Sequence, residues 1–167
     1  MSNERLIQVQ PATIEAFAPY GHLLTSQPGD PDGRAITVQR FEDTDLKGGR
    51  AFIGLMTYRW REFTFTHMEQ HGAFTQAFIP VDGKPAMVVV ARPAAGPDAG
   101  PDLADLKAFL LDGSQGIMLG RNIWHCPLFA AAEKATYAII TCLETPPESE
   151  RYLDVAAMAG QPFRLII

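Results

Sequence analysis

The chain has few cysteines, no cluster of basic residues and no long apolar run, and each absence argues against a class of protein. Its 167 residues include two cysteines, and 14 Lys and Arg residues are outnumbered by 19 Asp and Glu residues, giving a formal net charge of -5. Nucleic-acid binding is not expected, because it normally requires clustered Lys and Arg. The longest apolar run, residues 86–91, is too short to span a bilayer, so no membrane partner is expected.

The cysteines and the N-terminal residues indicate the cellular compartment of the protein. Cys126 and Cys142 lack the spacing of a metal-binding pair, and no apolar signal segment follows the first residues. Two thiols without a secretory context are expected to stay reduced, which predicts a cytoplasmic protein. Cys126 directly follows His125, so a catalytic thiol is one alternative, but a small buried packing residue is the favoured interpretation.

Length and composition predict one domain over residues 1–167. Hydrophobic residues make up 47% of the chain and charged residues 20%, which is ordinary for a soluble protein of a size that buries a proper core. The segments 26–34 and 93–102 are rich in Pro and Gly and are expected to be loops, not domain boundaries. We find no internal repeat and no second core.

Short strand-like segments separated by turn signals predict an all-β sandwich or barrel. Strands are expected at residues 6–10, 37–41, 51–58, 86–91, 108–111, 116–119 and 136–143, with 86–91 buried on both faces. Asp82-Gly83 predicts a hairpin. Residues 11–17 predict a short helix capped by Thr13. The apolar end, residues 163–167, is expected to pack on the core or on a partner subunit.

The stretch 63–71 departs from the pattern of a plain core strand. Because strand side chains alternate between faces, Phe63, Phe65, His67, Glu69 and His71 are expected on one face. Two aromatic rings followed by three ionisable groups predict a hydrophobic cavity with a polar, chemically active floor.

The spacing in and after this stretch resembles known motifs. Glu69-x-His71-x4-Gln76-x6-Gly83 is similar to the first cupin motif, His-x-His-x4-Glu-x6-Gly, and His125 stands where the second motif supplies a His. Three segments together resemble the ureidoglycolate lyase family of that superfamily: residues 15–21, Glu69 to Pro80, and Gly120-Arg121-Asn122-x-Trp124-His125-x-Pro127-Leu128. The chain departs from the family in three places: Gln70 replaces a usual Arg, Cys126 replaces a frequent His, and the segment between Arg59 and Glu69 is shorter than usual.

The resemblance implies a fold, an assembly and a reaction. The fold would be a cupin-type double-stranded β-helix, or jelly-roll barrel, with a few short helices, and the assembly a homodimer. The reaction would cleave a small-molecule substrate, ureidoglycolate, to glyoxylate and urea in allantoin breakdown. This makes the expected protein a carbon–nitrogen lyase.

The chemistry of this reaction matches the residues of the motifs. Elimination requires a base to take the hydroxyl proton and an acid to protonate the departing urea nitrogen. Glu69, His71 and His125 are the expected catalytic groups, since imidazole titrates near neutral pH and a carboxylate can be tuned by burial. The sequence leaves open which is base and which is acid. Gln76 is expected to orient the substrate through its amide.

The substrate carboxylate needs a cation or backbone amides, and a guanidinium matches it bidentately. Arg59 and Arg121 are the candidates, and His67 is a further substrate-binding candidate because it shares the face of Glu69. Each candidate site residue also has a plainer structural interpretation. The arginines could form surface ion pairs, the histidines could hydrogen-bond to the backbone, and Glu69 could belong to a structural ion pair.

No cofactor is expected to be required. If a divalent metal is bound, Glu69, His71, Gln76 and His125 are its expected ligands, although neutral Gln76 would weaken such a site. Two other functions stay open on the sequence alone. One is a different metal-dependent cupin enzyme, such as a dioxygenase or isomerase, and the other is a non-catalytic cupin that binds a small carboxylate.

Overall fold

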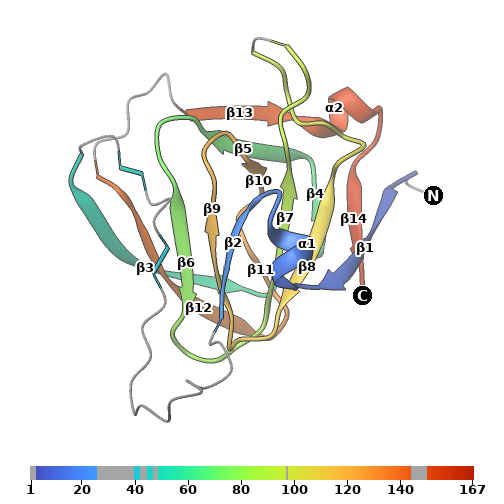
Figure 1. The fold of residues 1–167 in the computed structure, drawn as a ribbon. Helices are drawn as coiled ribbons and strands as arrows, with labels where there is room; N and C mark the ends of the chain where they lie inside the picture. The colour runs from blue at the N-terminus through green and yellow to red at the C-terminus, as the bar shows by residue number, and fades with distance from the viewer. Residues whose placement is uncertain (1–2, 26–39, 42–44, 47–48, 97, 144–149) are drawn as a thin grey trace.

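The computed structural model describes residues 3–25, 40–41, 45–46, 49–96, 98–143 and 150–167. Their strands form two curved sheets that pack face to face, with only two short helices (Figure 1). This confirms the predicted all-β jelly roll. The predicted loop at residues 26–34, and the predicted strand at 37–41 up to residue 39, lie outside the described residues.

The larger sheet has nine strands. Its order is β13 (Glu150–Asp154), β5 (His67–His71), β10 (Trp124–His125), β7 (Ala86–Ala91), β8 (Lys107–Leu111), β1 (Arg5–Pro11), β14 (Phe163–Ile166) and β4 (Thr64–Phe65), and β11 (Phe129–Ala130) also pairs with β7. β1 lies parallel to both β8 and β14. The apolar C-terminal segment is therefore part of the sheet, and Phe163 and Leu165 are buried, as predicted.

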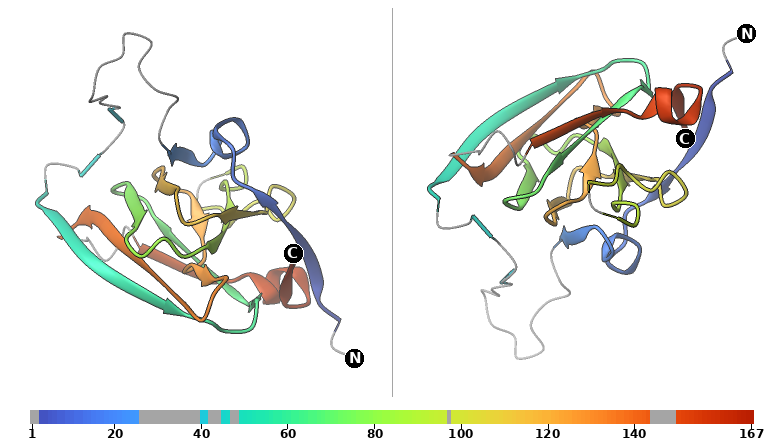
Figure 2. Two further views of the ribbon diagram at one scale, coloured as in Figure 1. Left: turned by 90° about the horizontal axis from the view of Figure 1, so that it is seen from below. Right: turned by 90° about the horizontal axis from the view of Figure 1, so that it is seen from above.

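The smaller sheet has five antiparallel strands. Its order is β2 (Gly21–Leu24), β9 (Gly116–Leu119), β6 (Gln76–Pro80), β12 (Lys134–Cys142) and β3 (Ala51–Arg59). β3 and β12 run side by side along their whole length (Figure 2). Buried and part-exposed residues alternate along β12, because one face of the strand meets the larger sheet and the other faces outward.

The predicted hairpin at Asp82-Gly83 is wrong. The chain does turn there, with Gly83 at φ 67°, but β6 pairs with β9 and β12 while β7 pairs with β8, β10 and β11. The turn carries the chain from one sheet to the other, so its two strands are not neighbours. A dipeptide turn signal reports the local backbone and carries no information about pairing partners.

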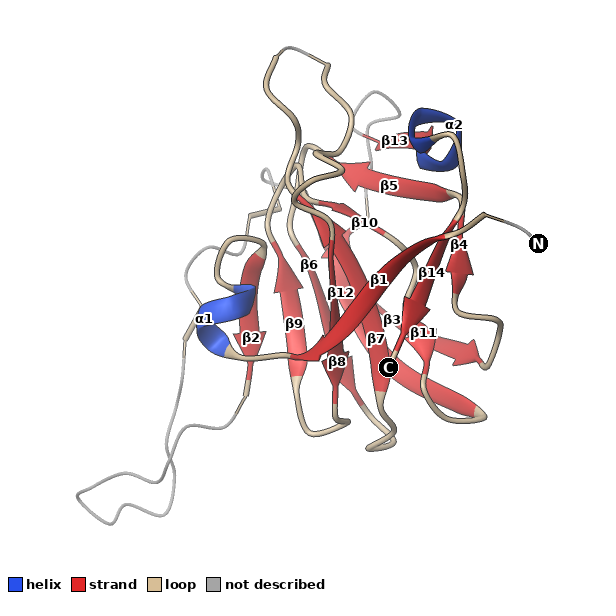
Figure 3. Cartoon of the chain, turned by 90° about the vertical axis from the view of Figure 1, so that its right-hand side faces the viewer, coloured by secondary structure: helices blue, strands red, loops and turns tan. Residues whose placement is uncertain are grey.

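The two helices lie at separate corners of the sheets (Figure 3). α1 (Ile14–Phe17) begins as predicted at Thr13, whose side chain accepts a hydrogen bond from the Ala16 amide at 3.1 Å. α2 (Val155–Ala159) was not predicted. Among the described residues, no helix has the length and apolar character needed to cross a membrane.

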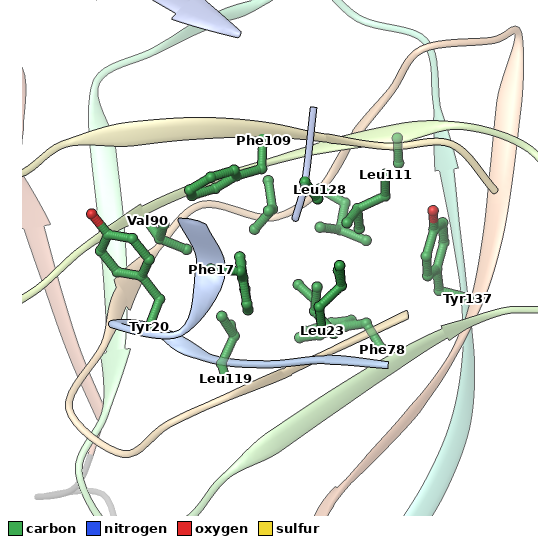
Figure 4. Close-up of a cluster of buried hydrophobic side chains, with 14 of the residues drawn as sticks. Phe17, Tyr20, Leu23, Phe78, Val90, Phe109, Leu111, Leu119, Leu128 and Tyr137 are labelled. Atoms are coloured by element: carbon green, nitrogen blue, oxygen red, sulfur yellow. The ribbon is translucent and has the colours of Figure 1, made fainter. Parts of the chain in front are cut away.

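Two buried apolar clusters lie on opposite faces of β7, which is buried along its full length as predicted. The inter-sheet cluster fills the space between the sheets and includes Phe17, Leu23, Phe78, Val88, Val90, Phe109, Leu111, Ile117, Leu119 and Tyr137 (Figure 4). The outer cluster includes Ile7, Val9, Phe65, Met68, Met87, Val89, Trp124, Cys126, Phe129, Val155 and Phe163. Its strand residues all come from the larger sheet, which therefore curls around it.

Candidate active site

β5 and β10 bring together the three ionisable groups that the sequence singled out. Glu69 lies directly opposite His125 in the antiparallel ladder, and His71 follows two residues further along β5. Because the neighbouring Met68 and Trp124 pack in the outer cluster, these three side chains point into the inter-sheet space. Their possible ligand atoms all lie within 4.8 Å of one another.

The predicted aromatic wall from the same strand is wrong. The strand is interrupted at Thr66, so β4 ends at Phe65 and β5 begins at His67. Phe65 is buried in the outer cluster and stacks on Phe163 with ring centroids 5.0 Å apart, and Phe63 packs against the same cluster. The interruption breaks the alternation of faces, so the two rings lie behind the site.

Glu69 and His125 form a close carboxylate–imidazole pair. Oε1 of Glu69 is 3.3 Å from Nε2 of His125, and both side chains are mostly buried. Nδ1 of His125 lies 3.0 Å from the Ile123 carbonyl oxygen, which only accepts, so Nδ1 donates. Burial alone would raise the pKa of Glu69, but its contact with His125 outweighs burial and holds the pKa below its usual range.

His71 is held as a neutral imidazole. Its ring stacks on Phe74 with centroids 5.2 Å apart, and the His125 ring is 5.4 Å away. Burial, and then the neighbouring His125, lower the pKa of His71 to about 4. At neutral pH the ring therefore carries no charge and has a lone pair available for a proton.

The depressed pKa of His71 predicts a pH-dependent stability. The unfolded chain takes up a proton near pH 6.5 and the folded chain only near pH 4, so stability is full above pH 6.5 and is lost as the pH falls between these values. The free energy of unfolding should be about 2 kcal/mol lower at pH 5 than at pH 7.5 from this group alone. Urea denaturation at both pH values measures the difference. His71→Gln should remove most of it, and an unchanged difference in that variant would contradict the assignment.

Two further polar groups come from β13, which sequence reasoning did not place at the site. β13 pairs with β5 so that Glu150 lies opposite His71 and Tyr152 opposite Glu69. Oε1 of Glu150 is 3.5 Å from Nδ1 of His71, and interaction with Tyr152 helps to lower the pKa of Glu69. The only signal in the sequence is the alternation of polar residues over 150–154, and nothing local specifies the pairing with a strand about 80 residues earlier.

The smaller sheet supplies the opposite wall. Gln76 on β6, a predicted site residue, and Thr141 on β12, which was missed, are each 8% exposed. Gln76 Oε1 and Thr141 Oγ1 are buried without a hydrogen-bond partner, whereas Nδ1 of His71 and Nε2 of His125 each face a carboxylate oxygen, at 3.5 and 3.3 Å. Most buried polar atoms in folded proteins are paired, so the two unpaired atoms on this wall indicate a place where a polar molecule binds.

Two predicted substrate-binding residues are not brought to this centre. His67 is exposed at the start of β5, where its Nδ1 lies 2.8 Å from the Thr66 hydroxyl. Arg59 is exposed at the end of β3, and the preceding Tyr58 is the side chain that turns inward against the inter-sheet cluster.

Arg121 lies closer to the centre. Its guanidinium is 3.1 Å from Oδ2 of Asp45. The next residue, Asn122, has φ 64° and donates its backbone N–H to the His71 carbonyl at 2.9 Å, which ties this turn to β5. The positive φ explains an Asn there, since Asn tolerates the left-handed region.

Two of the departures from the family pattern, Gln70 and Cys126, lie behind the site. Gln70 points away from Glu69 and His71, and it bridges the Asn122 carbonyl and the Arg151 guanidinium. Cys126 is buried in the outer cluster, and burial raises the pKa of its thiol. A catalytic thiol is therefore not supported, and the packing interpretation is. Cys126 and Cys142 are not joined in a disulfide.

The residues present fit a divalent transition metal. Glu69, His71 and His125 offer one carboxylate oxygen and two imidazole nitrogens within 4.8 Å of one another. His125 donates its Nδ1–H to a backbone carbonyl, the kind of contact that orients a metal-binding imidazole and leaves Nε2 free. The neutral amide of Gln76 faces the same space, so it would add no charge to such a set.

The fold and the site define a class: a jelly-roll protein whose interior carries a centre of two imidazoles and a carboxylate. The sequence model described as "Ureidoglycolate lyase" matches residues 4–159. The chain therefore belongs to the ureidoglycolate lyase family.

Named relatives agree with this placement. The chain is 34% identical over 142 residues to the ureidoglycolate lyase of Brucella anthropi, covering 79% of this chain and 80% of that protein. It is 37% identical over 134 residues to that of Escherichia coli O1:K1, covering 74% and 79%. A structure of the epimerase RmlC from Legionella pneumophila superposes with a TM-score of 0.46 at 15% identity, covering 77% of this chain and 75% of that one. That similarity is too low to carry an argument.

Proposed function

We propose that this protein is a ureidoglycolate lyase that cleaves ureidoglycolate to glyoxylate and urea in purine catabolism. The observation that carries the proposal is the centre of Glu69, His71 and His125 inside a chain whose residues 4–159 match the family. Ureidoglycolate carries a hydroxyl and a ureido nitrogen on the same carbon, next to a carboxylate. Its elimination requires one proton to leave the hydroxyl and one to reach the nitrogen.

The geometry supports separate roles for the two histidines. Nδ1 of His125 donates its N–H to a carbonyl, so in a neutral ring Nε2 would carry a lone pair. That lone pair would face the Glu69 carboxylate at 3.3 Å and be repelled by it, so the contact favours a proton between the two atoms. We assign that proton to the departing urea nitrogen. His71 is uncharged, and we assign it as the base that takes the hydroxyl proton, after which the C–O bond becomes the aldehyde of glyoxylate and the C–N bond breaks.

Arg121 is the guanidinium that we propose for the substrate carboxylate. Its turn is hydrogen-bonded to His71, and its partner Asp45 is tied through backbone contacts to Thr75, the neighbour of Gln76. Arg59 has no comparable connection to the centre. Arg121→Ala should therefore raise KM more than Arg59→Ala does.

We propose that no tightly bound metal is required, because the residues present supply both a base and an acid. Should a divalent ion bind, Glu69, His71, Gln76 and His125 would hold it, and it would polarise the substrate hydroxyl. The experiment is glyoxylate release from racemic ureidoglycolate before and after chelator treatment. Release that survives chelation supports the proposal. Release that is lost and then restored by one ion keeps the lyase but contradicts metal independence, and no release under any condition contradicts the function.

We further propose that the protein works as a cytoplasmic homodimer. The outer face of the smaller sheet supports the dimer, because β3 exposes Ile53 (71%) and Leu55 (72%) beside Ala138 and Ile140 of β12 and Ile79 of β6. A contiguous apolar face of this kind usually marks an interface.

Leu55→Asp is expected to shift the protein from dimer to monomer, because it places a charge in the apolar face that two copies would bury. Light scattering coupled to size-exclusion chromatography measures the mass. The matched control is Leu6→Asp, which changes a 57% exposed leucine on β1 of the other sheet and should leave the dimer intact. A dimer that survives Leu55→Asp would place the interface elsewhere.

A further inference from the structure

Two polar side-chain atoms on the smaller sheet are buried and have no hydrogen-bond partner in the fold. Gln76 Oε1 and Thr141 Oγ1 lack a hydrogen-bond partner, and each side chain is 8% exposed. The two lie next to each other, because β12 pairs with β6 at Ile140 and Ala77 and one further step sets Thr141 beside Gln76. An unpaired buried polar atom destabilises the fold, so two adjacent ones indicate a bound polar partner.

These atoms line a cavity of about 270 Å³ next to the catalytic groups. Its remaining polar wall is Glu150, whose carboxylate is 3.5 Å from His71 Nδ1, and its apolar walls include Phe52 and Phe74. Phe74 also stacks on the His71 ring. A molecule in the cavity is therefore beside the group that we assign as base.

The chemistry of the lining is selective. Glu150 contributes a negative charge, and no Lys or Arg is among the described residues that line the cavity. A carboxylate entering it would meet like charge without a compensating cation, which is unfavourable. An uncharged group with several N–H donors finds acceptors in the Glu150 carboxylate, the Gln76 amide oxygen and the Thr141 hydroxyl.

We propose that this cavity is the subsite for the ureido group and that Thr141 and Glu150, with Gln76, determine specificity for it. The inference rests on the proposed function. The substrate then has one orientation: its ureido end lies against β6, β12 and β13, its carboxylate points away from Glu150, and the carbon between them faces His71 and His125.

The test is Thr141→Val, which removes the hydroxyl and keeps the side-chain shape. KM for ureidoglycolate should rise about tenfold with kcat changed less than threefold, as expected for loss of one hydrogen bond to the substrate. Inhibition by urea should weaken by a similar factor, while inhibition by glyoxylate stays unchanged. The control is Thr136→Val on the outward face of the same strand, whose hydroxyl meets Thr57. It should change neither constant.

Glu150→Gln gives a second measurement, independent of whether Thr141→Val folds. Removing the charge should weaken inhibition by urea and strengthen inhibition by glyoxylate, because the repulsion of a carboxylate is gone. Equal changes for both inhibitors, or changes below twofold in both variants, would overturn the subsite. If the wild type released no glyoxylate from ureidoglycolate, the function would fail separately. NMR-detected binding of urea that is present in the wild type and lost in Thr141→Val would still support the subsite, and its absence in the wild type would refute it.

Discussion

Glu69→Gln is expected to lower kcat/KM for ureidoglycolate by about a hundredfold or more, the usual contribution of general acid–base catalysis. The substitution keeps the side-chain shape but removes the charge 3.3 Å from Nε2 of His125, so the shared proton is no longer held in place. Steady-state assays of glyoxylate release measure the loss. Most of the change should appear in kcat, because the pair acts on the reacting atoms and not on binding.

His125→Ala should produce a loss of the same order, and the double variant should lose little more than either single one, because the two residues act as a unit. Glu133→Gln is the matched control, since Glu133 is exposed and outside the site. Losses below fivefold in both single variants, with the control unchanged, would remove Glu69 and His125 from the proton-transfer steps.

Phe129→Ala is expected to lower the free energy of unfolding by about 3–5 kcal/mol, the usual cost of removing a fully buried aromatic side chain. Phe129 is 0% exposed, has the Phe63 and Phe65 rings at 6.4 Å, and lies 3.8 Å beneath the Arg61 guanidinium. Because we propose that residues 1–167 form one domain, the loss should shift a single urea-denaturation transition seen by fluorescence and by circular dichroism.

Phe129→Leu is the graded comparison and should cost less than half as much, because much of the volume is kept. Assays at a temperature where both variants are folded should give kcat/KM within about threefold of the wild type, since Phe129 lies in the outer cluster and not at the catalytic centre. Two separate transitions in either variant would contradict the single domain.

The parts of the fold that the sequence predicted are those that depend on local pattern. β7 is a continuous apolar run of six residues and β12 alternates over nine, so the burial of each strand follows directly from its sequence. The interruption at Thr66 was missed because extended residues on either side of a short break have the same composition as one strand. The Asp82-Gly83 turn was misinterpreted because sheet membership depends on partners far away in the chain.

The residues of the candidate site likewise fall into those that the sequence predicted and those that it did not. Motif spacing identified Glu69, His71, Gln76 and His125, because the motifs mark residues that the strands of this fold bring close together. Glu150, Tyr152 and Thr141 were missed because they reach the site through strand pairing, and no motif marks them. Arg59 was chosen for its place at a strand end, but the residue before it, Tyr58, is the one that faces inward.

The parallel pairing of β1 with β14 has a consequence for the newly made chain. β1 emerges from the ribosome long before β14, yet the two strands are neighbours that together cover one side of the outer cluster. Until residues 163–166 have emerged, Ile7 and Val9 lack their final cover, and β13 has only just become available to β5. Closing contacts of such long sequence separation is slow. The binding chamber of this protein therefore forms only after residues 163–166 have been made, and a chain that stops before them exposes apolar strand surface that cellular quality control can recognise.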